Sequence, residues 1–357
     1  MVSYRLAEEN DYPTIVEFYN KFHPTSKRDL NTFLWFYTQG VYGNCVFIVA
    51  FVNEQLVGFY GVIRIVVTTA SGEKVLTGKC EDALIDPEFR GKNILKGLIA
   101  KVFDECTRQG IVALWGFTAL REAFIRIGYE VPYKNSQSIA VGSFFTAYKQ
   151  LDKPSGNSKL KAKLKIAGFC AYAFLKQKIA MPKASLQAFQ MKDDKPVIQQ
   201  VDQLITAVLN EFPELFAIQQ SPDFQQWRIY DNPNLKDLYS VAYYNQHQEL
   251  VGLVVYNLSL PPVAYITQAT FHPTLNQSTA AAMLAAADKV VFAKGFGMIR
   301  NWQFTHNALN KKEVQIFKQA NHLFLNKGIC MVWRELQPGK LNPNNFYLSK
   351  IAAQGNT

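Results

Sequence analysis

The sequence repeats one pattern of strands and turns in its two halves. "FLWFYTQGVYGNCVFIVAFVNEQLVGFYGV" (33–62) and "FQQWRIYDNPNLKDLYSVAYYNQHQELVGLVVY" (224–256) each place an aromatic cluster before an apolar strand, a polar turn and a second strand opened by Leu-Val-Gly. The parallel extends to "AFIRIGYEV" (123–131) and "LFLNKGICMV" (323–332), each predicting a helix end, a glycine and a strand. Two copies of one α+β unit of about 150 residues account for the length better than one large domain.

A lysine-rich segment separates the two copies. Of the net charge of +10, the stretch 151–183 holds eight lysines and one aspartate, or 8 − 1 = +7. We therefore predict a domain at 1–150, a helical linker at 151–195 and a second domain at 196–357. Because the excess charge belongs to the linker, no specific nucleic-acid partner is expected. The favoured interpretation of the linker is a helix packed on one domain with solvated lysines; the alternative is an interfacial membrane contact.

Composition and cysteine usage bound the protein class. With 48% hydrophobic and 18% charged residues the chain is typical of globular proteins. The start, "MVSYRLAEEN", lacks the basic and apolar regions of a signal peptide, and the longest apolar run, "IAGFCAYAFL", is about half the length of a membrane span. The five cysteines have neither the pairing nor the spacing of a disulfide framework or a zinc site. We expect a cytoplasmic protein without a metal.

Periodicity predicts the elements of the first copy. Strands are expected at 2–7, 45–52, 56–69, 75–86 and 111–117 and after Gly128, and helices from residue 10 or 11, at 93–109 and at 121–127. The strands before and after the 93–109 helix become parallel neighbours. The fold class is therefore α+β, with a mixed, mostly antiparallel sheet flanked by helices and one central parallel crossover.

The stretch "DPEFRGKNILKGLI" (86–99) predicts an anion site. It joins a strand to a helix, so the first backbone N–H groups of the helix lack partners within the helix and point outward. The helix dipole favours a pyrophosphate there, and Arg90 and Lys92 add full positive charges. Gly91 permits close approach to the backbone, and Asn93 tolerates a left-handed conformation.

"DPEFRGKNIL" resembles the acyl-CoA pyrophosphate loop of the GNAT superfamily of N-acetyltransferases. That pattern is Arg or Gln, two residues, Gly, one residue, then Gly or Ala. "AFIRIGY" is similar to the family's closing "FYEKLGF". The resemblance covers residues 1–147 and, through the repeat, 197–335, so it implies two tandem GNAT-like domains. In this chain Asn93 replaces the first glycine and Leu95 the last small residue, while Phe124 replaces a tyrosine thought to protonate the leaving thiolate.

The resemblance implies acetyl-CoA as cosubstrate and assigns its binding residues. The backbone of Leu84 and Ile85 pairs with the pantetheine arm. The loop and helix start bind the pyrophosphate through Arg90, Gly91, Lys92, Asn93, Ile94 and Leu95.

The implied activity is acetyl transfer to a primary amine by direct attack on the thioester. The amine must lose a proton, so a nearby carboxylate serves as general base. Glu81 and Asp82 in "KCEDALID" are the candidates. Since successive strand residues face opposite sides, at most one of them is expected in the cleft, and Glu81 is slightly favoured. The expected acceptor is a small molecule or an amino sugar.

The second copy lacks the charged loop. "TFHPTLNQSTAAAM" has His272 and Pro273 where the first copy has Asp86 and Pro87, but no Arg, Gly or Lys follows. We expect it to keep the fold without binding the cofactor. His306 and His322 belong to no triad identifiable from the sequence. Two other functions stay open: a Fem-like transferase that uses aminoacyl-tRNA, and a catalytically silent acyl-CoA-binding protein.

Overall fold

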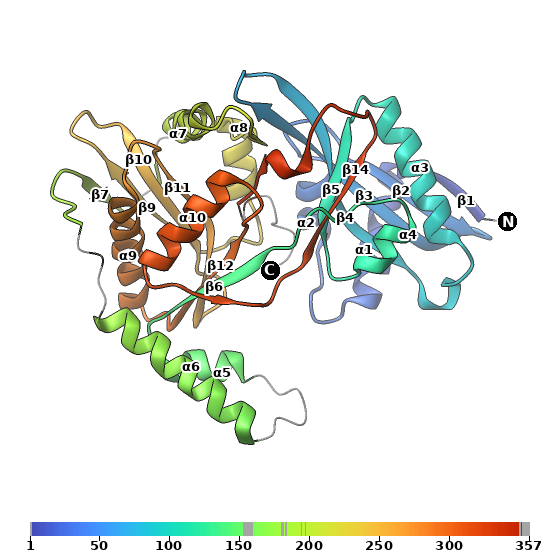
Figure 1. The fold of residues 1–357 in the computed structure, drawn as a ribbon. Helices are drawn as coiled ribbons and strands as arrows, with labels where there is room; N and C mark the ends of the chain where they lie inside the picture. The colour runs from blue at the N-terminus through green and yellow to red at the C-terminus, as the bar shows by residue number, and fades with distance from the viewer. Residues whose placement is uncertain are drawn as a thin grey trace.

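The computed structural model contains two β-sheets side by side and a helical pair that projects beyond them (Figure 1). It describes residues 2–152, 160–179, 182, 184–193, 195–196, 198–349 and 351. Of the linker lysines, Lys153, Lys159 and Lys183 lie outside the described residues.

The first sheet has the strand order β1-β2-β3-β4-β5-β14, with β8 and β15 at its side. Its elements are β1 (Val2–Leu6), η1 (Glu9–Asp11), α1 (Tyr12–Phe22), α2 (Leu30–Tyr37), β2 (Val46–Val52), β3 (Gln55–Thr69), β4 (Lys74–Ile85), η2 (Pro87–Phe89), α3 (Ile94–Arg108), β5 (Ala113–Thr118) and α4 (Arg121–Arg126). Asn53 and Glu54 have φ values of 48° and 66° in the β2–β3 turn, as a tight hairpin with right-twisted strands requires. The predicted strands and helices from β1 to α4 occur in the predicted order, and α2 is an additional helix that was not predicted.

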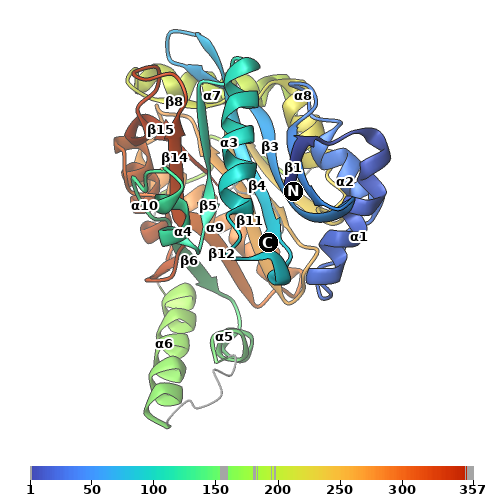
Figure 2. The same ribbon diagram turned by 90° about the vertical axis from the view of Figure 1, so that its right-hand side faces the viewer.

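Helices cover both faces of the first sheet. The α1 and α2 side chains pack on one face with Phe47 and Phe59, and those of α3 pack on the other with Ile48 and Tyr60. Figure 2 shows α3 lying lengthwise along the sheet, where it packs mainly on β2 and β3. β4 and β5, the strands joined by α3, are parallel as predicted.

The second sheet has the order β13-β6-β12-β11-β10-β9-β7. Its unit comprises β7 (Gln190–Lys192), α7 (Ile198–Glu211), β8 (Phe216–Ile218), α8 (Pro222–Gln225), the π-helix η3 (Gln226–Tyr230), β9 (Leu238–Tyr244), β10 (Leu250–Asn257), β11 (Val263–Phe271), α9 (Gln277–Ala293), β12 (Met298–Gln303), α10 (Ala308–Gln319), β13 (Leu323–Leu325), β14 (Cys330–Glu335), η4 (Pro343–Asn345) and β15 (Phe346–Tyr347). The predicted helix end at 323–325 is wrong, because these residues pair with β6.

The two units exchange a strand. β6 (Ser136–Val141) leaves the first unit and pairs with β12 over six residues. β14 leaves the second unit and pairs with β5 over six residues. Hydrogen bonds therefore cross the predicted division into 1–150 and 196–357 in both directions, and that division stays a prediction.

One apolar core joins the two sheets and is nearly symmetric. Trp35 Nε1 donates to Trp227 O at 3.2 Å, and Trp227 Nε1 donates to Trp35 O at 3.1 Å. These tryptophans occupy matching places in the two repeats, and both are buried, as expected for interface aromatics. The repeat seen in the sequence thus corresponds to two units facing each other across this core.

The described part of the predicted linker contains one long helix and the short strand β7 of the second sheet. α6 (Leu160–Ile179) packs with α5 (Phe144–Leu151) against β6. Among the helices in the described part of the chain, none is long and apolar enough to cross a membrane.

Candidate functional site

The predicted loop forms an open helix N-terminus. Arg90, Gly91, Lys92 and Asn93 are all exposed at the start of α3. Gly91 and Asn93 have φ values of 78° and 59°, so the left-handed conformation expected for Asn93 is present. Among the residues that the structure describes, no side chain caps α3, so its first amides are available to an anion beside two cationic side chains.

Other loop contacts fix the backbone. Asp86 Oδ1 accepts from Glu88 N at 3.0 Å, and Lys21 Nζ donates to Asp86 Oδ2 at 3.2 Å. Arg90 Nε donates to Ile85 O at 3.4 Å, which draws the arginine toward the end of β4. Ile94 is buried in the core beneath α3, so only its backbone can meet a ligand.

A gap between β4 and β5 leads to this loop. The two strands pair only at Gly78 with Leu114 and at Lys79 with Trp115. β4 then runs on to Ile85 without pairing to β5. The two strands therefore separate beyond Lys79, and this leaves one edge of the β4 backbone, including Leu84 and Ile85, open to another hydrogen-bonding chain.

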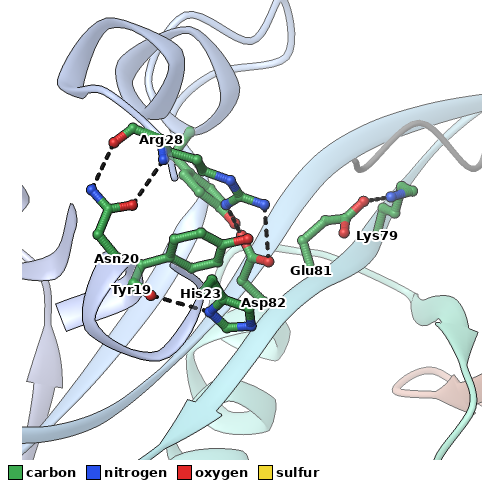
Figure 3. A network of polar contacts seen from close by, with 8 residues as sticks. Tyr19, Asn20, His23, Arg28, Lys79, Glu81 and Asp82 are labelled. Atoms are coloured by element: carbon green, nitrogen blue, oxygen red, sulfur yellow. Dashed lines mark hydrogen bonds and ion pairs between the residues drawn. The ribbon is translucent and has the colours of Figure 1, made fainter. Parts of the chain in front are cut away.

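A β-bulge places both candidate carboxylates on the same face. β4 pairs Tyr60 with Ala83 but Gly61 with Glu81, so Asp82 is an extra residue, and its φ is 44°. Asp82 contacts Arg28, and Glu81 contacts Lys79 two residues back on its own face of the strand (Figure 3). Strict alternation therefore fails at the bulge, and the expectation that at most one of the two carboxylates lies in the cleft stays a prediction.

Asp82 is held by two strong donors. Arg28 donates to both carboxylate oxygens, with Nη2 at 3.2 Å from Oδ1, and the Tyr37 hydroxyl donates to Oδ2. Burial lowers the pKa of Arg28, but the Asp82 carboxylate raises it further, to above its ordinary value. Arg28 follows α1, and Asn20 fixes it, accepting from Arg28 N and donating to Arg28 O at 2.8 Å each. Neither Arg28 nor Tyr37 was predicted as a site residue.

Glu81 has a buried lysine as its ion-pair partner. Lys79 is only 3% exposed, and burial, with the Arg228 guanidinium second, holds its pKa well below the usual range. Arg228 lies in the π-helix of the second unit, and burial lowers its pKa to about 10. Sequence reasoning missed both, because Lys79 precedes the acidic pair and Arg228 comes from the other repeat.

A small pocket opens beside Asp82. Its walls are Ile15, Val16, Tyr19, Arg28, Phe33, Tyr37, Phe47, Phe59 and Asp82. These residues come from α1, from the loop that holds Arg28, from α2 and from the strands β2, β3 and β4 that face them. Apolar and aromatic walls with one ion pair are typical of a small-molecule site.

Phe124 packs against Tyr129, which carries the hydroxyl that position 124 lacks. The ring centroids are 5.3 Å apart, and the Tyr129 hydroxyl is 3.3 Å from Cys80 Sγ. Cys80 directly follows the last parallel pair of β4. Burial raises the pKa of Tyr129 well above its ordinary value, so this hydroxyl stays protonated near neutral pH.

The second unit is closed at the corresponding place. Asn276 caps α9, because its side chain accepts from Thr279 N at 2.8 Å. β11 and β12 also splay after three parallel pairs. There the residues after β12 bind the C-terminal segment: His306 Nε2 donates to Phe346 O at 2.7 Å, and Asn310 Nδ2 donates to Leu348 O at 3.0 Å.

A buried polar chain in the second unit resembles a triad in composition only. His322 Nε2 contacts Asp288 Oδ2 at 2.8 Å, and His322 Nδ1 is 3.4 Å from Ser138 Oγ. All three residues are at most 1% exposed, so no substrate reaches the serine. The chain instead ties the exchanged strand β6 to α9.

Within the described residues, no group of three or more His, Cys, Asp or Glu side chains is arranged to hold a metal ion.

Comparison with known proteins agrees with this geometry. Residues 3–131 match a family model described as an acetyltransferase (GNAT) domain. No curated protein matches the chain. A probable N-acyltransferase from Enterococcus faecalis superposes with a TM-score of 0.65 at 10% identity, over 94% of this chain and 73% of that one.

Two further solved structures have the same fold. A GCN5-related N-acetyltransferase from Anabaena variabilis has a TM-score of 0.63 at 11% identity, covering 94% of this chain and 73% of its own. A tandem GNAT protein from the clavulanic acid biosynthesis pathway has a TM-score of 0.57 at 9% identity. The match covers 95% of this chain and 100% of that one.

The fold is that of tandem GNAT structures, with two similar units in one chain. Residues 3–131, in the first unit, match the GNAT acetyltransferase domain.

Proposed function

We propose that the protein transfers an acetyl group from acetyl-CoA to a primary amine of a small molecule. One observation carries this proposal: the open edge of β4 leads directly to an uncapped α3 N-terminus flanked by Arg90 and Lys92. A ligand with an amide-containing arm and a pyrophosphate fits both features, because the strand edge pairs amides and the helix start binds phosphates. The residues present therefore suit acetyl-CoA.

Each predicted binding residue has a role in this proposal. Leu84 and Ile85 offer backbone groups to the arm. Arg90, Lys92 and the amides of Ile94 and Leu95 bind the pyrophosphate, while Gly91 and Asn93 shape the turn. The internal contrast supports this assignment, because the capped α9 keeps the same fold without the charged loop.

We assign the general base to Glu81. It accepts a proton from the acceptor amine, directly or through water, while the amine nitrogen bonds to the acyl carbon. The carbon–sulfur bond breaks and its electron pair leaves with the thiolate, whose pKa of about 8.5 makes it a tolerable leaving group. Asp82 is the weaker candidate, because Arg28 and Tyr37 already occupy its oxygens. It instead positions Arg28 at the pocket.

The acceptor belongs in the pocket beside Asp82. Its aromatic and aliphatic walls suit a compact molecule with an apolar part, and the Asp82–Arg28 ion pair suits its polar groups. A small amine or an amino sugar is therefore the proposed acceptor class. The second unit contributes Arg228, whose positive charge acts on Lys79 beside the proposed base.

Titration with acetyl-CoA tests the proposal. Arg90→Glu reverses a charge at the helix start, so we expect affinity measured by calorimetry to fall at least about tenfold. Lys101→Glu makes the same charge change two turns further along α3 and serves as the matched control.

Three outcomes separate the functions. Acetyl-CoA binding that Arg90→Glu leaves unchanged would overturn the proposal. Binding without transfer to any amine of a broad panel would favour a silent binding protein. Binding of aminoacyl-tRNA in place of acetyl-CoA would favour a Fem-like transferase, and its affinity should fall steeply with salt.

A further inference from the structure

The linker helix α6 has two apolar faces, and only one of them is covered. Ile166, Cys170 and Ala173 point inward and pack with α5 and β6. The other face carries large apolar side chains that are between 52% and 78% exposed: Leu160, Leu164, Tyr172, Leu175 and Ile179. Their spacing of three, four or eight residues aligns them along one side of the helix.

Positive charge borders this outer face. α6 contains five lysines and no acidic residue over its 20 positions. At 100° per residue, Lys165 and Lys176 lie along one border of the apolar stripe and Lys178 at the other, whereas Lys161 lies within the stripe and Lys163 lies on the opposite side of the helix. An exposed apolar stripe between lysines is the pattern of a helix that lies in a membrane interface.

The position of the helix suits such a contact. Figures 1 and 2 show α5 and α6 projecting from one end of the molecule, away from both sheets. The pair is also firmly attached: Gly142 N and Ser143 N both donate to Gly297 O, at 3.0 and 2.9 Å. A fixed, protruding helix can reach a flat surface that the sheets do not touch.

We infer that the outer face of α6 binds the surface of an anionic lipid bilayer. The leucines and isoleucine enter the boundary between headgroups and acyl chains. The lysines extend their ammonium groups to the lipid phosphates while their stems follow the apolar stripe. This inference does not rest on the proposed enzymatic function.

Other occupants fit the face less well. RNA binding uses stacked aromatics and arginine, whereas this stripe is mostly aliphatic and all its cations are lysines. A second copy packed through the same face in a symmetric contact would oppose lysine-rich borders to each other, and like charges repel.

Vesicle flotation of the full chain tests the inference. We expect the protein to float with vesicles of phosphatidylcholine and phosphatidylglycerol in equal parts, and much less with phosphatidylcholine alone. Leu164→Glu combined with Leu175→Glu should lower the association constant at least about tenfold, because two exposed leucines lose their burial in the membrane. Lys161→Glu and Lys165→Glu should each lower the association constant about fivefold, and only for anionic vesicles.

Leu120→Glu is the matched control, since Leu120 is 69% exposed in the first unit. All the substitutions are at exposed positions, and thermal unfolding of each variant checks that it is folded. Three results would overturn the inference: flotation that the leucine variant leaves unchanged, binding of tRNA without vesicle binding, or a dimer that the leucine variant dissociates without vesicle binding. Acetyl-CoA titration of the same samples reports the proposed function separately.

Discussion

At the scale of single residues, the site depends on one inserted residue in β4. The bulge at Asp82 turns two neighbouring carboxylates to one face, where each finds a different cation. Local sequence predicts a strand with acids but not a bulge, because the bulge is set by pairing with β3. The distinct partners of Glu81 and Asp82 then predict distinct effects of their substitution.

Glu81→Gln should lower kcat about a hundredfold and leave the affinity for acetyl-CoA unchanged, because it removes the proposed base but keeps its shape.

Asp82→Asn should instead lower the free energy of unfolding by about 3 kcal/mol, since it removes the carboxylate that pairs with the largely buried Arg28. Steady-state kinetics and urea unfolding of both variants check this pair. Asp104→Asn on the exposed side of α3 is the control. A larger loss of kcat in folded Asp82→Asn than in Glu81→Gln would contradict the assignment.

At the scale of elements, the C-terminal strand β15 is hydrogen-bonded to α10 of the second unit. Tyr347 of β15 donates to Glu313 Oε1 on α10, and Asn310 Nδ2 donates to Glu313 Oε2 at 3.0 Å. Burial raises the pKa of Glu313 from 4.5 to about 7. The folded state thus binds more protons than the unfolded state between these pH values.

The contribution of Glu313 to stability is therefore present below about pH 4.5 and lost as pH rises through about 7. In Glu313→Gln this pH-dependent loss should disappear. From pH 5 to pH 8, the free energy of unfolding of the variant should therefore rise by about 1–3 kcal/mol relative to that of the wild type. Urea unfolding at both pH values measures the difference. Glu211→Gln, at the exposed end of α7, should show no such gain. A parallel pH dependence in wild type and Glu313→Gln would refute this account.

At the scale of the whole molecule, the exchanged strands make each unit complete the other. β14 brings Met331 and Trp333, both at most 1% exposed, into the first sheet along the full length of β5. β6 fills the second sheet between β12 and β13. Without the strand from the other unit of the chain, each sheet would expose an apolar edge.

We therefore expect residues 1–156 and 157–357 to aggregate or stay unfolded when produced alone, and to form a stable complex when produced together. Circular dichroism and size-exclusion chromatography of the separate and co-expressed halves test this. The intact chain should unfold in one cooperative transition. Cooperative unfolding of isolated 1–156 would show that the exchange is dispensable.

Sequence periodicity was sufficient for most elements of the first unit and for the repeat, but not for α2 or for β13. Strand and helix patterns are local, so β2 through α4 and the linker helix appear where the apolar spacing predicts them. The same holds for the loop, because a basic glycine-containing turn before a helix has its anion-binding character in any fold that keeps the helix start open. Asn93 in particular adopts the left-handed conformation that its side chain tolerates.

Only the tertiary structure decided which elements meet. Local patterns carry no signal for strand pairing between distant segments, so neither the exchange of β6 and β14 nor the bulge at Asp82 could be predicted. The cations around the carboxylates come from a loop after α1, from β4 itself and from the other repeat, and packing alone brings Arg28, Lys79 and Arg228 together. The sequence by itself determined most of the helices and strands and the chemistry of the 90–93 loop. Long-range strand pairing decided where Glu81 and Asp82 lie, because hydrogen bonds between strands join residues that are far apart along the chain.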